Sequence, residues 1–355
     1  MKILHFAVEN YARVPANLVK AERKLGHESY LITLYHTFQG YGDEDICLEM
    51  PFVATNYITF LKRFFSPTKT QVTNLRKDAK DGVPVWKPTN GITNQLFKLR
   101  DRLWENKIRR VLDSLEVESF DLLFLDGGAG FLRSAKIVRE LKEKGLRIII
   151  CYCGSDLRTR GIIPAVEEIA DHRFTFEFDH TLYHPELKFM YFPFELVDFK
   201  RPLQKNSTKI RIGHAPTSRS AKGTDEILKE LNPLREKYQV EIVLIENLPH
   251  QDALTLKASC DIFVDTIGEL GYGINSLESL AMGIPTAVQI LPDFEAVLGE
   301  HPFINISRQT IAEKLVPLIE SGDFRKEFGG KGKRWVEENH DPLKVSRTVL
   351  SCIQN

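Results

Sequence analysis

A turn with two glycines in the second half of the chain carries residue types that bind phosphate. Residues 271–273 read Gly-Tyr-Gly, follow the apolar run 260–265 and precede a helical pattern that contains Glu278. Glycines let a backbone approach a ligand closely, and N–H groups at a helix start point toward anionic oxygens. Glu278 falls about one turn into that helix, where a carboxylate can accept hydrogen bonds from ribose hydroxyls. Such turns also arise from packing alone, so both interpretations stay open.

A second loop places two cations after a predicted strand that ends at His214. Arg219 and Lys222 are followed by Gly223 and Thr224, which open a helical pattern. Cations beside a helix start form a charge-assisted clamp that suits a diphosphate. A pair of surface cations without a ligand is the alternative, and Thr224 is expected to act as the helix N-cap.

A third loop follows the apolar run 146–153 and contains Asp156. Ligands gather at the carboxyl ends of parallel strands, so this position suits a ligand contact. Asp is also a favoured N-cap, so Asp156 could instead cap the helix that follows. Cys151 and Cys153 fall on one face of the predicted strand and are expected to be core thiols rather than metal ligands.

These three motifs resemble the retaining glycosyltransferases of the GT-B fold, and family 4 in particular. The family signature reads Glu, Gly-Phe-Gly, Glu, then Ala-Met-Ala-x-Gly-x-Pro. Residues 271–273, Glu278 and 281–285 fall in register with it, whereas Leu270 replaces the first Glu. The third loop resembles the family's His-Gly-Ser-Asp-Leu, with Cys153 at the His position, and the second resembles its Arg…Lys-Gly phosphate clamp.

The resemblance implies an α/β fold of two Rossmann-like domains that face across a cleft, with the C-terminal helix crossing back to the N-terminal domain. It implies domains at 1–200 and 208–335 and a returning helix at 336–355. Residues 200–202 and the polar run 204–208 are the predicted linker between the domains. It further implies metal-independent transfer of a sugar, with retention, from a nucleotide-diphosphate sugar to a hydroxyl of a glycan, a lipid-linked or a small-molecule acceptor. No cofactor is implied, and the leaving phosphate would deprotonate the acceptor.

The site residues that follow from the residues and the resemblance form two sets. The set expected to act in catalysis is Cys153, Asp156, Arg219 and Lys222. The set expected to bind the nucleotide sugar is His214, Arg219, Lys222, Asn247, Tyr272, Gly273, Ile274, Asn275 and Glu278.

Apolar periodicity predicts the same architecture. A strand, helix and strand open the chain, and the same order restarts after residue 208, which is typical of a second Rossmann-like domain. The amphipathic pattern 93–115, with Leu96, Leu99 and Leu103 among its apolar positions, predicts a long helix. The predicted elements at the two openings and the C-terminus are strands 3–8, 29–33, 209–214 and 240–245 and helices 16–25, 224–238, 324–335 and 342–353.

Composition limits the partners. Lys+Arg and Asp+Glu both number 48, so no overall field favours nucleic acid. Five cysteines in mostly apolar runs, without a signal peptide or membrane span, indicate a reducing, cytoplasmic setting. Residues 56–65 mix aromatic side chains with cations, so they form either an amphipathic helix packed on the N-terminal domain or a contact with an anionic membrane surface. The acidic residues at 43–45 are expected to form a solvated turn rather than a metal site.

Two other functions remain open on the sequence. A sugar-nucleotide 2-epimerase would share the two-domain fold, but it needs acid-base residues that the N-terminal motifs supply poorly. A non-catalytic protein that binds a nucleotide sugar or a glycan is favoured by Cys153 and Leu270, where the family pattern is lost.

Overall fold

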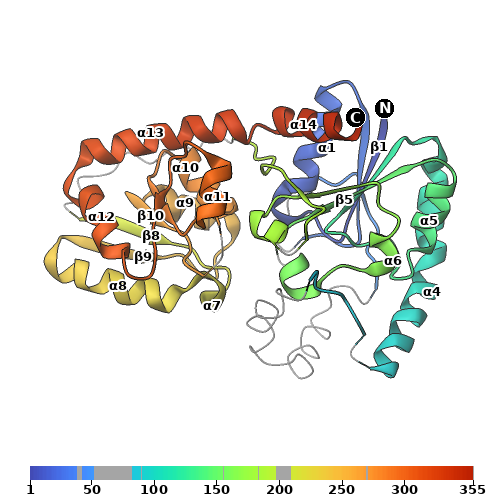
Figure 1. Cartoon of the computed structure of the whole chain (residues 1–355), viewed down its shortest axis with the longest axis horizontal. Coiled ribbons are helices and arrows are strands. Elements are labelled where there is room, and N and C mark those ends of the chain that lie inside the picture. The colour runs from blue at the N-terminus through green and yellow to red at the C-terminus, as the bar shows by residue number, and fades with distance from the viewer. Residues whose placement is uncertain are drawn as a thin grey trace. The chain divides into compact units, whose positions relative to one another are not determined.

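The computed structural model describes residues 1–37, 42–51, 82–88, 90–154, 156–182, 184–196, 209–268 and 271–354. The chain divides into two compact units, each with its own sheet and helices (Figure 1). The first unit comprises Met1–Pro193 and Val345–Asn355, and the second comprises Phe194–Lys344. The predicted linker, residues 56–65, and the pair Glu269 and Leu270 contain or consist of residues outside the described ranges.

The first unit is built on a parallel sheet with the strand order β3-β2-β1-β4-β5-β6-β7. The central strand β4 is buried at every position, because a parallel sheet is covered on both faces and selects continuous apolar runs. Its strands are β1 (Lys2–Ala7), β2 (Glu28–Thr33), β3 (Ile46–Cys47), β4 (Leu122–Asp126), β5 (Arg147–Tyr152), β6 (His172–Thr175) and β7 (Lys188–Phe189).

Helices connect these strands. The α-helices are α1 (Val14–Lys24), α4 (Gly91–Ser114), α5 (Lys136–Glu143) and α6 (Pro164–Glu167). Shorter helical turns are η1 (Tyr11–Arg13), η3 (Val117–Ser119), η4 (Asp156–Arg160) and η5 (Phe178–Leu182). The C-terminal helix α14 (Pro342–Gln354) ends in the first unit, where Arg147 Nη1 donates a hydrogen bond of 3.0 Å to the carbonyl oxygen of Ile353.

Helix α4 confirms the predicted long helix and carries two apolar stripes, of which one is buried. Its buried side chains are Trp104, Ile108 and Leu112. A second apolar stripe, also at helical spacing, lies on the exposed side of the helix. The exposed fractions along this α4 stripe are 74% for Ile92, 61% for Leu96, 54% for Leu99 and 57% for Leu103. The pattern predicts the helix but not which of its two apolar stripes is buried, because stripes of similar periodicity cannot be ranked without knowing the neighbouring elements.

The second unit repeats the design, as the restart of the sequence pattern predicts. Its parallel sheet has the order β12-β11-β10-β8-β9. The strands are β8 (Ile210–His214), β9 (Val240–Leu244), β10 (Ile262–Val264), β11 (Thr286–Val288) and β12 (Ile304–Asn305). The helices are α7 (Arg219–Lys222), α8 (Thr224–Lys237), α9 (His250–Ala258), α10 (Ile274–Ala281), α11 (Pro292–Leu298), α12 (Ile311–Glu320) and α13 (Gly322–Asn339).

In the part of the chain that the structure describes, none of the helices is both long enough and apolar enough to span a bilayer.

Candidate functional site

The predicted diphosphate clamp lies in the second unit where β8 and β10 end. Lys222 closes α7 and is only 6% exposed, and its Nζ lies 3.2 Å from Oδ1 of the fully buried Asp265. Burial would raise the pKa of Asp265, but the charge of Lys222 and a 2.5 Å hydrogen bond from the Ser276 hydroxyl outweigh it and lower the pKa. Asp265 was not among the predicted site residues. Its position at the end of the apolar run that precedes the glycine turn was the signal that could have identified it.

Two glycines fix the backbone around Lys222. Gly223 has a φ of +70°, and a Cβ on it would lie 2.6 Å from Ile267 Cγ1. A Cβ on Gly268 would lie 2.1 Å from the carbonyl oxygen of Ala221. The loops after α7 and β10 therefore pack backbone against backbone, and the amide of Ile267 donates to the carbonyl of Lys222 at 3.2 Å. This contact sets where the lysine side chain starts.

His214 has both ring nitrogens engaged within the protein. Nδ1 donates to the carbonyl oxygen of Val264 at 2.8 Å, so Nε2 accepts the hydroxyl hydrogen of Thr224 at 2.9 Å. Burial lowers the pKa of His214, which agrees with a neutral ring. The N-cap of α8 is Gly223 rather than Thr224, so the predicted capping role is wrong. His214 thus ties the end of β8 to the start of α8.

Arg219 lies at the surface of the same connection. Its Nη1 is 3.0 Å from both carboxylate oxygens of Glu246, and its Nη2 is 3.1 Å from Asp225 Oδ1. Asp225 and Glu246 raise its pKa. Asn247, next to Glu246, is exposed and has a φ of +55°, a left-handed conformation that asparagine tolerates well. Arg219 and Asn247 therefore both present polar groups at the surface of this unit.

The start of α10 presents backbone donors. Gly273 is the N-cap, and no side chain caps the helix. The first amide to bond within the helix turn is that of Leu277, to the carbonyl of Gly273, so the preceding amides have no intrahelical acceptor. A Cβ on Gly273 would meet no atom within 4 Å, so the space beside the turn is open. The backbone amides of Ile274 and Asn275, predicted to contact an anion, thus lie at an uncapped helix start.

Glu278 lies in the second turn of α10 and is held from two sides. His250 Nε2 donates to Oε1 at 2.8 Å, and the ammonium group of Lys257 contacts Oε2. Burial would raise the pKa of Glu278, but the charge of Lys257 and the His250 hydrogen bond outweigh it and lower the pKa. Lys257 also donates to Asn275 Oδ1 at 2.7 Å, and the side-chain Nδ2 of Asn275 donates to the carbonyl of Ala215 at 3.1 Å.

Lys257 is the residue of this group that sequence reasoning missed. It is 1% exposed and lies on α9. Nothing in its local sequence distinguishes it from a surface lysine, because its partners come from a different helix.

Tyr272 contributes its backbone to the turn and its side chain to the core. Its ring centroid lies 4.7 Å from that of Phe303 and 5.5 Å from those of Phe294 and Trp335. Its hydroxyl is 3.2 Å from His340 Nε2. The buried ring therefore anchors the glycine turn rather than facing a ligand.

In the first unit, Asp156 closes the end of β5. Its Oδ2 accepts the Cys153 amide at 3.1 Å and contacts the Cys153 thiol at 3.6 Å, and its Oδ1 lies 3.4 Å from Arg160 Nη1. The carboxylate thus turns back on the strand rather than capping the helix that follows. Burial raises the pKa of Asp156, and burial together with Asp156 raises that of the Cys153 thiol well above its usual value. Cys153 can therefore act as a weak donor but not as a thiolate.

His180 forms hydrogen bonds with the loop that contains Asp156, and it was not among the predicted site residues. Its Nε2 lies 3.1 Å from the carbonyl oxygen of Gly154, and its Nδ1 lies 2.8 Å from the Thr175 hydroxyl. Burial lowers the pKa of His180 to about 4, so the ring is neutral, donates to Gly154 and accepts from Thr175.

The acidic residues 43–45 lie at or near the surface, and two of them form ion pairs. Asp43 lies 2.9 Å from Lys20 Nζ and 3.2 Å from Arg13 Nε, and Asp45 lies 2.7 Å from Arg23 Nη2. They fasten the chain after β2 to α1. The remaining acid joins the one group among the described residues that offers three possible metal ligands, with ligand atoms within 4.8 Å of one another: His36, Glu44 and Cys47. The hydrogen bond from His36 to Glu44 accounts for part of this grouping without a metal.

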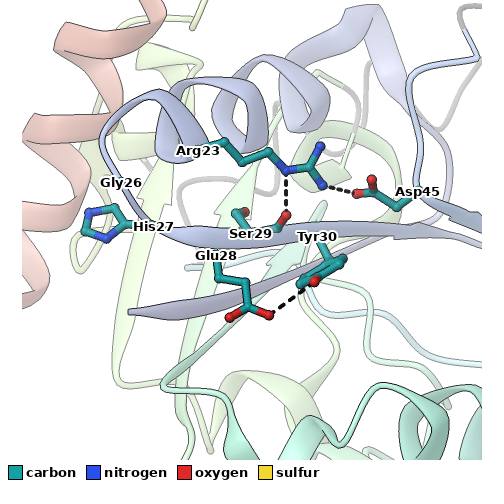
Figure 2. A pocket seen from close by; sticks show the side chains of 7 residues that line it. All are labelled: Arg23, Gly26, His27, Glu28, Ser29, Tyr30 and Asp45. Atoms are coloured by element: carbon teal, nitrogen blue, oxygen red, sulfur yellow. Dashed lines mark hydrogen bonds and ion pairs between the residues drawn. The ribbon is translucent and has the colours of Figure 1, made fainter.

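A surface depression on the first unit lies at the opposite end of the strands from the loop that carries Asp156. Figure 2 shows Arg23 reaching both the carbonyl of Ser29 and Asp45, while Glu28 meets the Tyr30 hydroxyl. Glu28 begins β2, so the depression is at the amino end of the strands, whereas ligands of such sheets bind at the carboxyl ends. We therefore do not place the functional site there. Its lining residues are Arg23, Gly26, His27, Glu28, Ser29, Tyr30 and Asp45.

No protein-family model and no curated protein matches the sequence. Solved structures do match over the whole chain. HepE from Anabaena in complex with UDP-glucose has a TM-score of 0.59 and 11% identity, covering 100% of both chains. Sucrose-phosphate synthase from Thermosynechococcus elongatus has a TM-score of 0.59 and 10% identity, covering 100% of this chain and 98% of its own. The glycosyltransferase SnogD from Streptomyces nogalater has a TM-score of 0.51 and 15% identity, covering 99% and 100%. With two parallel sheets matched in full by these structures, the chain has the GT-B fold of glycosyltransferases.

Proposed function

We propose that the protein is a glycosyltransferase that moves a sugar from a nucleotide-diphosphate sugar to an acceptor hydroxyl. The observation that carries the proposal is the grouping in the second unit of a buried lysine, an open helix start and a buried carboxylate. Lys222, the amides at the start of α10 and Glu278 all follow the carboxyl ends of parallel strands. The GT-B fold supports the same conclusion, and HepE, which shares it, is solved with UDP-glucose.

The chemistry of these groups suits a leaving nucleoside diphosphate. Negative charge grows on the diphosphate as the glycosidic bond breaks, and the Lys222 ammonium with the amides of Ile274 and Asn275 would stabilise it. Asp265 would hold the lysine in place before the donor arrives, so little reorganisation is needed. Glu278 retains acceptor capacity beside its two protein partners, because each carboxylate oxygen has two lone pairs, and would bind the ribose hydroxyls.

The finer assignments are also part of the proposal. Arg219 and Asn247 would contact the donor from the exposed side, and His214 would act by holding the loop that carries Lys222. Asp156 and Cys153 in the first unit would contact the sugar or the acceptor by hydrogen bonds. We propose transfer with retention and without a metal ion, as the sequence resemblance implies. Proton NMR of the product's anomeric signal would test retention, and activity in excess EDTA would test metal independence.

Donor binding tests the second-unit assignment. Lys222→Ala and Glu278→Ala should each weaken UDP binding in titration calorimetry, since a hydrogen bond to a charged group contributes about 1.5–3 kcal/mol, or roughly 10- to 150-fold. Lys229→Ala is a matched control, because Lys229 is exposed on α8 and forms no ion pair with a described residue. Unchanged affinity in both site variants would contradict the assignment. Consumption of a labelled donor would then separate an enzyme from a protein that only binds nucleotide sugars.

We further propose that the first unit contacts an anionic membrane surface through the α4 stripe. Four leucine and isoleucine side chains on this stripe are more than half exposed. The same helix carries four exposed cations, none of which forms an ion pair with a described carboxylate: Lys98, Arg102, Lys107 and Arg110. An apolar stripe beside unpaired cations is the pattern of helices that lie in the headgroup region of an anionic bilayer.

Vesicle co-sedimentation tests this contact. The protein should pellet with vesicles that contain phosphatidylglycerol and stay in solution with pure phosphatidylcholine. The double variant Leu96→Glu/Leu99→Glu should lose the binding, whereas Val297→Glu, at a residue 55% exposed on α11, should keep it. Binding that does not depend on lipid charge or on the leucines would contradict the proposal.

A further inference from the structure

Two arginines of the first unit lie against a pair of aromatic rings, and a third arginine lies close enough to act on the charge of one of them. The Arg133 guanidinium carbon lies 4.9 Å from the Trp86 ring centroid and 5.9 Å from that of Phe97. The Arg100 guanidinium carbon lies 4.8 Å from the same Phe97 centroid, and the two rings meet edge to face. Arg160 approaches from the loop after β5 and donates to the carbonyl of Gly127. We name Arg100, Arg133 and Arg160 the arginine cluster.

The cluster lies beside the loops in which the fold places its ligands. Arg133 is in the connection after β4, and Arg160 is in the connection after β5, so both follow the carboxyl ends of neighbouring strands. Segment 82–88 is fixed to the same place, because the Trp86 amide donates to the Ile162 carbonyl and the Ile162 amide to that of Pro84, both at 2.8 Å. Arg160 also lies 3.4 Å from Asp156, a residue proposed to contact sugar or acceptor.

The charges in this cluster do not balance. Asp101 pairs with Arg100 at 2.8 Å and Asp156 pairs with Arg160, but Arg133 has no hydrogen bond or ion pair with any residue in the described ranges. Burial, together with the like charges of Arg160 and Arg100, lowers the pKa of Arg133 to about 9. Two donors, Arg133 Nη1 and Arg100 Nε, are buried without a hydrogen-bond partner.

An anionic ligand would balance the excess positive charge and would accept hydrogen bonds from the buried donors that have no partner. It would supply the missing negative charge and accept hydrogen bonds from guanidinium groups, which present rigid donor forks that match phosphate or carboxylate oxygens. The aromatic faces of Trp86 and Phe97 hold the guanidinium planes in place in the meantime.

We propose that the arginine cluster binds an anionic group, a phosphate or a carboxylate, on the acceptor. This inference rests on the proposed transferase function and narrows its substrate class to charged acceptors. The anion would sit against Arg133 and be shared with Arg100 or Arg160, next to the loop that holds Asp156.

Thermal denaturation with inorganic phosphate tests the anion site without a donor. At constant ionic strength, phosphate should raise the melting temperature of the full-length protein, since a ligand of the folded state stabilises it. Arg133→Gln should lose most of that rise, and so should Arg133→Met, which keeps an apolar contact with Trp86. Arg139→Gln is the control, because Arg139 is exposed on α5 and lies outside the cluster. If the Arg133 variants fold and respond to phosphate as the wild type does, or if the wild type does not respond to phosphate or acetate, the anion site is refuted. If phosphate binds only near Lys222, it should raise the melting temperatures of the wild type and of all variants equally, and this result would count against the inference.

An acceptor panel then tests the role of the site. With a labelled UDP-sugar, the wild type should transfer to sugar phosphates or uronic acids in preference to the neutral sugars, and the preferred class distinguishes phosphate from carboxylate. Arg133→Gln should raise the KM for the charged acceptor at least tenfold and leave the KM for the donor unchanged. A preference for neutral acceptors, or an unaltered acceptor KM, would overturn the inference. If the wild type does not bind UDP, the proposed function is refuted. The phosphate experiment would still show whether the arginine cluster binds an anion.

Discussion

Replacing Lys257 with methionine should destabilise the second unit strongly. The side chains of Lys257 and Glu278 are 2% and 7% exposed, so the substitution leaves a buried carboxylate with His250 as its remaining partner. Breaking a buried ion pair from one side costs about 3–5 kcal/mol. For a domain of this size, roughly 2–4 °C of melting temperature corresponds to each kcal/mol, so the expected loss is roughly 6–20 °C.

The pH dependence of this loss has a definite sign. The pKa of Glu278 is lowered in the folded protein, so the pair contributes stability above the ordinary glutamate pKa of 4.5 and loses it as the pH falls through the folded-state pKa. Without Lys257 the pKa of Glu278 should rise, and protonation then removes the unpaired charge. The difference in melting temperature between wild type and Lys257→Met should therefore shrink from pH 7 toward pH 4.5.

Differential scanning calorimetry with a double-mutant cycle provides the measurement. Lys257→Met/Glu278→Gln removes both charges and should melt at a higher temperature than Lys257→Met alone, since the penalty comes from the unpaired carboxylate. Lys229→Met is the control at an exposed position on α8. A Lys257→Met variant as stable as the wild type, or a double variant no better than the single one, would refute the reasoning.

Three further predictions follow from the same geometry. Gly268→Ala should lower the free energy of unfolding by about 1–3 kcal/mol and weaken UDP binding, because its Cβ would lie 2.1 Å from the Ala221 oxygen. Gly273→Ala is the stability control, because its Cβ would meet nothing within 4 Å. Equal melting temperatures of the two variants would contradict this prediction. Tyr272→Ala should cost about 3–5 kcal/mol in chemical denaturation, and Tyr272→Phe only about 0.5–1.5 kcal/mol for the hydroxyl contact with His340. Burial opposes a charge on His5, but Glu22 and Asp126 on either side of the ring raise its pKa to about 10. The charged ring therefore stabilises the fold fully below pH 6.5, and this contribution is lost as the pH rises toward 10. The free energy of unfolding of His5→Gln should vary less over that pH range than that of the wild type.

The sequence predicted the order of elements because the signals for them are local. An apolar run, a glycine turn and a helical pattern define the β10–α10 connection from residues that are close neighbours in the chain. Parallel strands bring their carboxyl ends to one edge, so the approximate position of Lys222 and Glu278 followed from the same information.

Only the tertiary structure decided what these side chains contact. Asp265 as the partner of Lys222, Lys257 as the partner of Glu278 and the unbalanced charge at Arg133 all depend on which elements become neighbours. The two apolar stripes of α4 could not be ranked from their spacing, because burial depends on the surface that a helix meets. Local patterns define backbone segments and their order, whereas the pairing of charges is a property of distances between segments far apart in the chain.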